Sequence, residues 1–192
     1  MDNCRRQLHS LKLDSLTIWG LTDEFTGVEA VNRLDLDTIE AAAQRIAPHI
    51  VTTPLLESPR LNDWLGFRLL IKAENLQNTG SFKLRGASNA IWSLDDDVRK
   101  VFAYSSGNHA QGVAHAATTR GLQATILMPE DSPRVKIAGT RAFGGTVITY
   151  DRYVENREDI GERIAAETGA ILIRPYEDTR VTVSYTHLRA HE

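Results

Sequence analysis

The chain of 192 residues has a single cysteine, Cys4. One thiol cannot form a disulfide within the chain, so a disulfide scaffold is excluded and a reducing, cytoplasmic location is expected. The formal net charge is -3, which gives no sign of a nucleic-acid partner. Apolar runs are short, so we expect no membrane-spanning helix and no membrane partner. Met1–Ser10 contains two arginines with no apolar segment behind them, which does not resemble a secretory signal.

The remaining composition, 42% apolar and 24% charged residues, is that of a globular protein. Residues 1–33 show no hydrophobic period, and we interpret them as an N-terminal extension of uncertain structure. From Asp35, apolar residues recur at helical spacing until Pro48, which predicts a helix that ends there. Thr53–Leu56 is then predicted to be extended, and Phe67–Ala73 to be an apolar strand.

Short strands and helices alternate along the rest of the chain. The predicted helices are Lys83–Leu94, Asn108–Arg120, Pro133–Phe143 and Glu158–Thr168, and the predicted strands are Val101–Tyr104, Ala124–Met128, Thr146–Tyr150 and Ala170–Ile173. This order predicts an α/β fold with parallel sheets and flanking helices. The alternation is expected to end at Asp178, and Ser184–Glu192 fits no element. We interpret residues 183–192 as a non-native tail.

The first chemical motif is Asn78–Ala87, in which a turn with Gly80 leads to Lys83 at the start of a predicted helix. The positive end of the helix dipole and burial both disfavour the charged form of such a lysine. A neutral amine is a nucleophile toward an aldehyde. The alternative is an ordinary surface lysine, the usual environment of this residue type. Arg85 and Arg134 are interpreted as ion-pair partners rather than catalytic groups.

The second motif, Ser105–Gly112, follows a predicted strand and opens a predicted helix. Backbone N–H groups at a helix N-terminus point toward whatever lies in front of it, so this loop can hold an anion. Its serines and Asn108 add polar side chains. The alternative is an ordinary βα turn with a glycine and an asparagine cap.

Together the two motifs resemble the fold type II (tryptophan synthase β-like) pyridoxal-phosphate enzymes, threonine/serine dehydratases and serine racemases in particular. The resemblance runs from about residue 37 to 181 and includes four shorter blocks: Thr53-Pro54-Leu55, Met128-Pro129, Phe143-Gly144-Gly145 and Pro175-Tyr176-Glu177-Asp178. It implies that residues 34–182 are the N-terminal portion of a pyridoxal-phosphate-dependent lyase, with a small domain over roughly 100–176. It also implies an amino-acid substrate and a homo-oligomeric parent protein.

The resemblance assigns roles to the motif residues. Lys83 would hold the cofactor covalently and later remove the α-proton of the substrate. Phe82 would pack beside the cofactor ring, and Asn108 would hydrogen-bond its phenolic oxygen. The substrate carboxylate would be held by Ser81 and by the loop residues Ser106, Gly107, Asn108 and His109. The product would be a 2-oxo acid with release of ammonia. No Cys/His cluster indicates a metal, since the pair His187 and His191 is weak evidence by itself.

Several alternatives stay open. Racemising members of the family tend to have serine at the position of Ser106, a candidate acid on the opposite face of the substrate, so a serine or hydroxyaspartate racemase/dehydratase is the close rival. The simpler interpretation is that Ser106 only completes the loop. A non-catalytic binding or regulatory module would be expected to lack the lysine, whereas Lys83 is present. A nucleotide-binding Rossmann domain would need a G-x-G-x-x-G run after the first strand, and Phe67–Ala73 is not followed by one.

In this family a glycine-rich phosphate loop, and a serine or threonine beside the pyridine nitrogen, lie C-terminal to the matched region. Neither occurs in this sequence. We therefore expect the chain to be an incomplete fragment that binds the cofactor poorly and has little activity.

Overall fold

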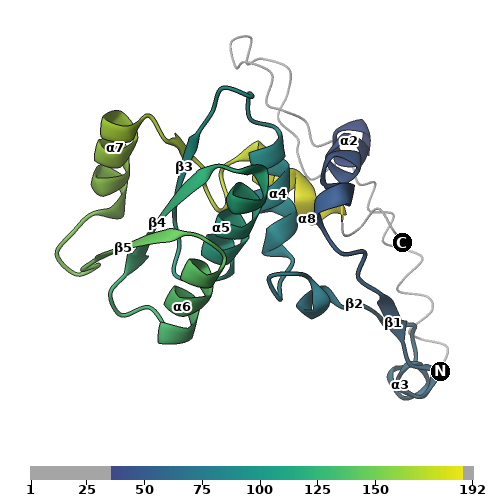
Figure 1. The fold of residues 1–192 in the computed structure, drawn as a ribbon. Helices are drawn as coiled ribbons and strands as arrows, with labels where there is room; N and C mark the ends of the chain where they lie inside the picture. The colour runs from purple at the N-terminus through teal and green to yellow at the C-terminus, as the bar shows by residue number, and fades with distance from the viewer. Residues whose placement is uncertain (1–35, 188–192) are drawn as a thin grey trace, which may run out of the picture. The chain divides into compact units, whose positions relative to one another are not determined.

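The computed structural model describes residues 36–187, and the predicted extension 1–33 lies outside them. The main feature is a four-stranded parallel sheet (Figure 1). Its strands are β3 (Lys100–Tyr104), β4 (Gln123–Pro129), β5 (Thr146–Tyr150) and β6 (Ile171–Leu172), in the order β5-β4-β3-β6. All three pairings are parallel, as the alternation predicted. The sheet lies within the predicted small domain of 100–176, whose separateness stays a prediction.

Both faces of the sheet are covered by helices. On β3, Val101 and Ala103 belong to a core shared with α5 (Asn108–Arg120), whereas Phe102 and Tyr104 belong to a second core packed by α7 (Arg157–Thr168). Side chains of a strand alternate between the two faces, and a parallel sheet buries both. Figure 1 shows α7 on one side and α5 with α6 (Arg134–Ala142) on the other.

Glycines end two of the predicted helices. Gly121 ends α5 and Gly169 ends α7, with φ of 78° and 67° in the left-handed region. A residue with a Cβ avoids this region, which is why both positions were predicted as helix ends.

The helix that begins at the predicted cofactor lysine packs on α5. This helix, α4 (Lys83–Trp92), is buried from Leu84 to Ile91. It approaches α5 at Gly112, where an added Cβ would lie 3.2 Å from the Lys83 carbonyl oxygen. The small residue at 112 therefore sets how closely the backbone of Lys83 approaches α5. The helices α2 (Leu36–Ile46) and α8 (Thr179–His187) also contact α4.

A small two-stranded sheet precedes α4. Its strands β1 (Leu55–Glu57) and β2 (Leu70–Lys72) pair antiparallel, so this part does not join the parallel sheet. Between them lies α3 (Pro59–Leu65), which the sequence analysis missed. The Ser58 hydroxyl accepts a hydrogen bond from the Leu61 N–H at 3.4 Å, and Pro59 takes the first helical position. Ser-Pro is a local start signal that helical periodicity alone does not detect over so short a helix. A 3-10 turn, η2 (Glu74–Leu76), follows.

The expectation that the alternation ends at Asp178 is wrong. Helix α8 follows directly, and it includes Ser184–His187, which had been assigned to no element. Asp178 caps this helix, since its Oδ1 accepts from the Arg180 N–H at 3.0 Å, and Asn89 of α4 donates to the Arg180 carbonyl oxygen at 2.7 Å. Threonine and valine have low helix propensity, so tertiary packing decides the outcome here. The non-native origin of residues 183–192 stays a prediction.

Within residues 36–187, the helices are too short or too polar to cross a membrane.

Candidate active site

The order of the strands changes direction at β3, which favours a ligand site at the carboxyl edge of the sheet. From β3 the chain winds outward to β4 and β5, and β6 then returns to the other side of β3. In open α/β sheets, ligands bind at the carboxyl ends of the strands where the winding direction changes. Here that edge carries the loop after β3, which begins at Ser105, and the segment after β6, which begins at Ile173.

Lys83 is the first residue of α4 and is half-buried. Its Nζ lies 4.5 Å from the centroid of the Tyr176 ring and 5.4 Å from that of Phe82. Burial lowers the pKa of Lys83 below its ordinary value, although Tyr176 acts in the opposite direction. The N-terminal end of α4 also disfavours the charged amine. The environment therefore raises the fraction of neutral, nucleophilic amine.

Two buried hydroxyl groups lie just before this lysine. Thr79 Oγ1 and Ser81 Oγ have no hydrogen-bond partner among the described residues. Between them Gly80 adopts a φ of 69°, which turns the chain into α4. A buried hydroxyl without a partner costs free energy and calls for an explanation. An oxygen-rich ligand bound beside Lys83 would supply one, so these residues fit a site for such a ligand.

The loop after β3 forms an uncapped helix N-terminus. Gly107 stands at the N-cap of α5 and contributes no side-chain cap. The first intrahelical hydrogen bond runs from the Gln111 N–H to the Gly107 carbonyl oxygen at 3.4 Å. The preceding amides, those of Asn108, His109 and Ala110, have no intrahelical acceptor, and the helix dipole adds positive potential. Together they can bind a carboxylate. Ser106 and Asn108 are exposed at this position.

The side chain of Asn108 is held by a lysine that was not predicted as a site residue. Lys136 of α6 donates from Nζ to Asn108 Oδ1 at 2.5 Å. A weaker contact joins the same Nζ to Gln111 Oε1 at 3.4 Å.

His109 joins the loop after β3 to the end of β6. Its ring is only 2% exposed, and Nε2 donates to the Ile173 carbonyl oxygen at 3.1 Å. The carbonyl can only accept, so Nε2 carries the hydrogen. Burial lowers the pKa of His109 to about 4, and the ring is therefore neutral near pH 7. Nδ1 has no partner among the described residues. The imidazole acts as a structural link, while its backbone amide belongs to the uncapped helix N-terminus.

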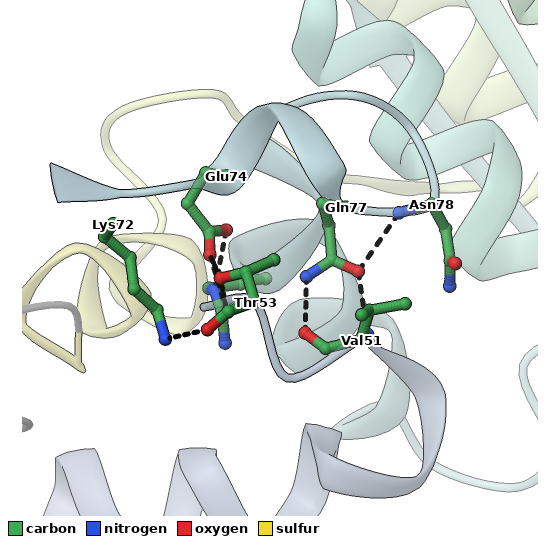
Figure 2. A network of polar contacts seen from close by, with 7 residues as sticks. Val51, Thr53, Lys72, Glu74, Gln77 and Asn78 are labelled. Carbon is green, nitrogen blue, oxygen red and sulfur yellow. Dashed lines mark hydrogen bonds and ion pairs between the residues drawn. The ribbon is translucent and has the colours of Figure 1, made fainter. Parts of the chain in front are cut away.

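A buried polar network anchors the first turn of α4 (Figure 2). Arg85 donates to both carboxylate oxygens of Glu74, at 2.8 and 2.7 Å, and Thr53 donates to the same carboxylate at 2.5 Å. Figure 2 also shows Lys72 donating to the Thr53 carbonyl oxygen. The interpretation of Arg85 as an ion-pair partner is confirmed, whereas Arg134 makes no ion pair with the described acidic side chains.

A second group of contacts in Figure 2 centres on Gln77. Its side chain accepts from the Val51 N–H at 2.8 Å and donates to the Val51 carbonyl oxygen at 2.9 Å. The Asn78 N–H also donates to Gln77 Oε1, at 3.1 Å. These bonds tie the start of the lysine motif to the strand-like segment before β1.

The structure thus sorts the predicted site residues into two groups. Ser81, Phe82 and Lys83 form the approach to α4, and residues 106–109 form the start of α5. The contact between Gly112 and the Lys83 carbonyl oxygen brings the two helices together. Tyr176 was not predicted as a site residue. Its only signal was membership of the Pro175–Asp178 block.

These features define an α/β protein in which a partly desolvated lysine at a helix N-terminus lies near a loop whose free backbone amides could bind an anion. The family model described as pyridoxal-phosphate dependent enzyme matches residues 46–189. The chain therefore belongs to the pyridoxal-phosphate-dependent enzymes, and its cofactor is pyridoxal 5'-phosphate. The predicted resemblance and fold class are confirmed.

Three relatives illustrate the similarity. L-threo-3-hydroxyaspartate ammonia-lyase of Saccharomyces cerevisiae is 49% identical over 138 residues, which cover 71% of this chain and 42% of that protein. The structure of maize serine racemase matches with a TM-score of 0.74 at 40% identity, covering 78% of this chain and 46% of that one. The structure of a threonine deaminase, from the organism abbreviated T.th., matches with a TM-score of 0.72 at 46% identity, covering 81% and 51%.

The chain spans less than half the length of the curated relatives that it matches, 42% to 43% for two hydroxyaspartate ammonia-lyases and a serine racemase. The relatives are named as ammonia-lyases and racemases, and the family model that matches this chain is that of the pyridoxal-phosphate-dependent enzymes.

Proposed function

We propose that the protein is a pyridoxal-phosphate-dependent ammonia-lyase that converts a β-hydroxy amino acid, threonine or serine, to a 2-oxo acid and ammonia. The observation that carries this proposal is the environment of Lys83. Its amine is half-buried with a lowered pKa, lies near two aromatic rings, and begins the helix that packs on the anion-binding α5. A structural surface lysine has no need of this combination.

Each site residue has its own role in this proposal. When bound, pyridoxal phosphate supplies the electron sink that stabilises negative charge at the substrate α-carbon. Lys83 would hold the cofactor and then accept the α-proton at Nζ, which requires a neutral amine. Phe82 would lie beside the cofactor ring, and Asn108 would donate to its phenolic oxygen.

Ser81 and the backbone amides of residues 106–109, of which those of Asn108 and His109 have no intrahelical acceptor, would hold the substrate carboxylate. Fixing the carboxylate orients the α C–H bond toward the base. The unpartnered Ser81 hydroxyl and the absence of a side-chain cap at Gly107 support this assignment.

A β-hydroxyaspartate substrate is the second candidate, and a hollow at Tyr176, whose ring Lys83 Nζ approaches at 4.5 Å, favours it. Its lining includes Arg157, which is paired with Glu158 at 2.7 Å, and Arg174. Arg174 is only loosely paired with Glu177, at 3.8 Å. A second carboxylate on the substrate could pair with a guanidinium there. Relatives named hydroxyaspartate ammonia-lyase, at 49% identity, point the same way. Ser106 keeps the racemase alternative open.

The test combines trapping and product analysis. The protein is incubated with excess cofactor, reduced with borohydride and mapped by mass spectrometry, with Lys83→Arg as the negative variant and the exposed Lys100→Arg as the matched control. We expect the label on Lys83 in the unmodified chain and in the Lys100 variant, because excess cofactor offsets the weak binding expected of an incomplete fragment. A label on another lysine, or no label, would refute the proposal.

Release of 2-oxo acid from threonine, serine and threo-3-hydroxyaspartate, which we expect to be slow in this chain, then ranks the substrates. Chiral analysis of recovered serine detects racemisation. Arg174→Gln separates the two candidate substrates. It should reduce turnover of hydroxyaspartate and leave threonine turnover unchanged if the hollow binds the second carboxylate.

A further inference from the structure

We propose that Lys136 is a positioning residue that fixes the orientation of the Asn108 side-chain amide, so that the amide presents its NH2 group to the cofactor. The inference rests on the proposed function, in which Asn108 is the donor to the phenolic oxygen. It adds a residue on a different helix, α6, that decides whether this donor is available.

The argument begins with the hydrogen-bonding capacities of the two side chains. A lysine ammonium has three donors and no acceptor, whereas an asparagine amide has an acceptor at one end and two donors at the other. The contact at 2.5 Å therefore assigns the amide oxygen of Asn108 to the side of Lys136. The NH2 end is directed away from Lys136. Without the ammonium, the two orientations of the amide would differ much less in energy.

The ammonium itself is held in place. Besides Asn108 Oδ1, it lies 3.4 Å from Gln111 Oε1. No carboxylate among the described residues forms an ion pair with Lys136, so its charge is directed to these two amide oxygens. Hydrogen bonds from a charged donor are shorter and stronger than those between neutral groups.

The helices α5 and α6 pack closely against each other at this point. Asn108 and Gln111 are three residues apart on α5, and Lys136 and Gly139 are three residues apart on α6, so each pair lies on one helix face. At Gly139 an added Cβ would lie 2.1 Å from Gln111 Nε2. Gln111 is buried, and its amide is therefore confined between Gly139 at its nitrogen end and Lys136 at its oxygen end. The Lys136 ammonium is thus part of a packed contact between α5 and α6.

The first test uses the cofactor-free, 15N-labelled chain. The side-chain amide of Asn108 is assigned through Asn108→Ser and compared in Lys136→Met, Lys136→Arg and, as the matched control, Lys100→Met, which removes a lysine charge elsewhere. We expect the Asn108 amide signal to shift toward that of an unconstrained asparagine in Lys136→Met and to return in Lys136→Arg. An unchanged signal in Lys136→Met, or an equal shift in the Lys100 control, would overturn the proposal.

The second test measures cofactor binding and the visible absorption band of the bound cofactor. Lys136→Met should weaken binding by roughly two- to tenfold, the range of one hydrogen bond's net contribution, and should change the band. Lys136→Arg should restore both properties. Wild-type affinity and an unaltered band in Lys136→Met would contradict the positioning role even if the amide signal shifts.

The two proposals fail in different ways. If borohydride trapping labels no residue or a residue other than Lys83, the proposed function fails, while the orientation of Asn108 is still decided by the signals of the cofactor-free chain. If trapping labels Lys83 in both Lys136→Met and the parent sequence, but the amide and the absorption band are insensitive to Lys136, only the further inference fails.

Discussion

Replacing Arg85 by methionine tests how α4, and with it Lys83, is anchored. Arg85 is 3% exposed and donates to both carboxylate oxygens of Glu74, whose side chain is 11% exposed. Methionine keeps much of the apolar volume of the side chain and removes the charge. The carboxylate of Glu74 would then lie in a largely buried position with only the hydroxyl of Thr53 and more distant charges to stabilise it.

The magnitude follows from burial. Removing one partner of a buried pair typically costs about 3–5 kcal/mol, because the other charge is left uncompensated. Glu74 keeps some contact with solvent, so we expect about 3 kcal/mol, the lower end of that range. The pair between Arg68 and Glu57 supplies the matched control, since its closest contact is 2.8 Å but its side chains are 74% and 33% exposed. Arg68→Met should cost about 0–1 kcal/mol, as exposed pairs do.

Urea unfolding followed by circular dichroism gives the free energy of unfolding, and the dependence of this free energy on urea concentration shows whether unfolding stays two-state. The double variant Glu74→Leu/Arg85→Met should recover most of the loss, because it removes both charges. Equal effects of Arg85→Met and Arg68→Met would refute the reasoning, as would a double variant no more stable than Arg85→Met.

The same pair predicts a pH dependence. Burial by itself would raise the pKa of Glu74, but hydrogen bonds from Arg85 and Thr53 outweigh burial, and the pKa is lower than the ordinary value of 4.5. A depressed folded-state pKa gives stability that is present above 4.5 and is lost as the pH falls below it. This loss of stability at acid pH should be smaller in the double variant Glu74→Leu/Arg85→Met.

Three further predictions concern the site. Gly112→Ala should push the backbone of Lys83 away from α5, which should lower the free energy of unfolding by about 1–3 kcal/mol through overpacking and should weaken cofactor binding. An unchanged free energy of unfolding together with unchanged cofactor binding would contradict the close approach. Because burial depresses the pKa of His109 to about 4, the protein should lose stability as the pH falls from 6.5 to 4. Urea unfolding at a series of pH values should show that His109→Gln lacks this part of the loss. Parallel stability curves for the two proteins would contradict the prediction. Tyr176→Leu should lower the pKa of Lys83, because Tyr176 raises it and its ring lies 4.5 Å from the ammonium. The pH dependence of acetylation of the cofactor-free chain measures this pKa, and the same labelling curve in both proteins would exclude the role.

The sequence by itself determined the family and most of the local structure. Helical spacing located α5 at the bounds that the structure shows, and Gly121 and Gly169 marked helix ends because glycine suits the left-handed φ of that position. The two motifs around Lys83 and residues 105–112 carried the family resemblance. These are local signals, since they depend on backbone preferences and on the order of residue types.

Predictions from the sequence were wrong where contacts between distant segments of the chain decide the local structure. The propensities of α8 are poor, yet the cap from Asp178 and the contact of Arg180 with Asn89 hold the helix in place. The short helix α3 and the antiparallel pairing of β1 with β2 were also missed, because each is only a few residues long. Hydrophobic periodicity needs several turns or strands to be recognised.

The tertiary structure alone decided which side chains meet. Placing β6 beside β3 brings Tyr176 over Lys83, and packing α6 on α5 brings Lys136 to Asn108. Neither contact is encoded by spacing along the chain, because it depends on strand order and on which helix faces are opposed. The sequence therefore predicts which lysine reacts, and the fold determines which groups surround it.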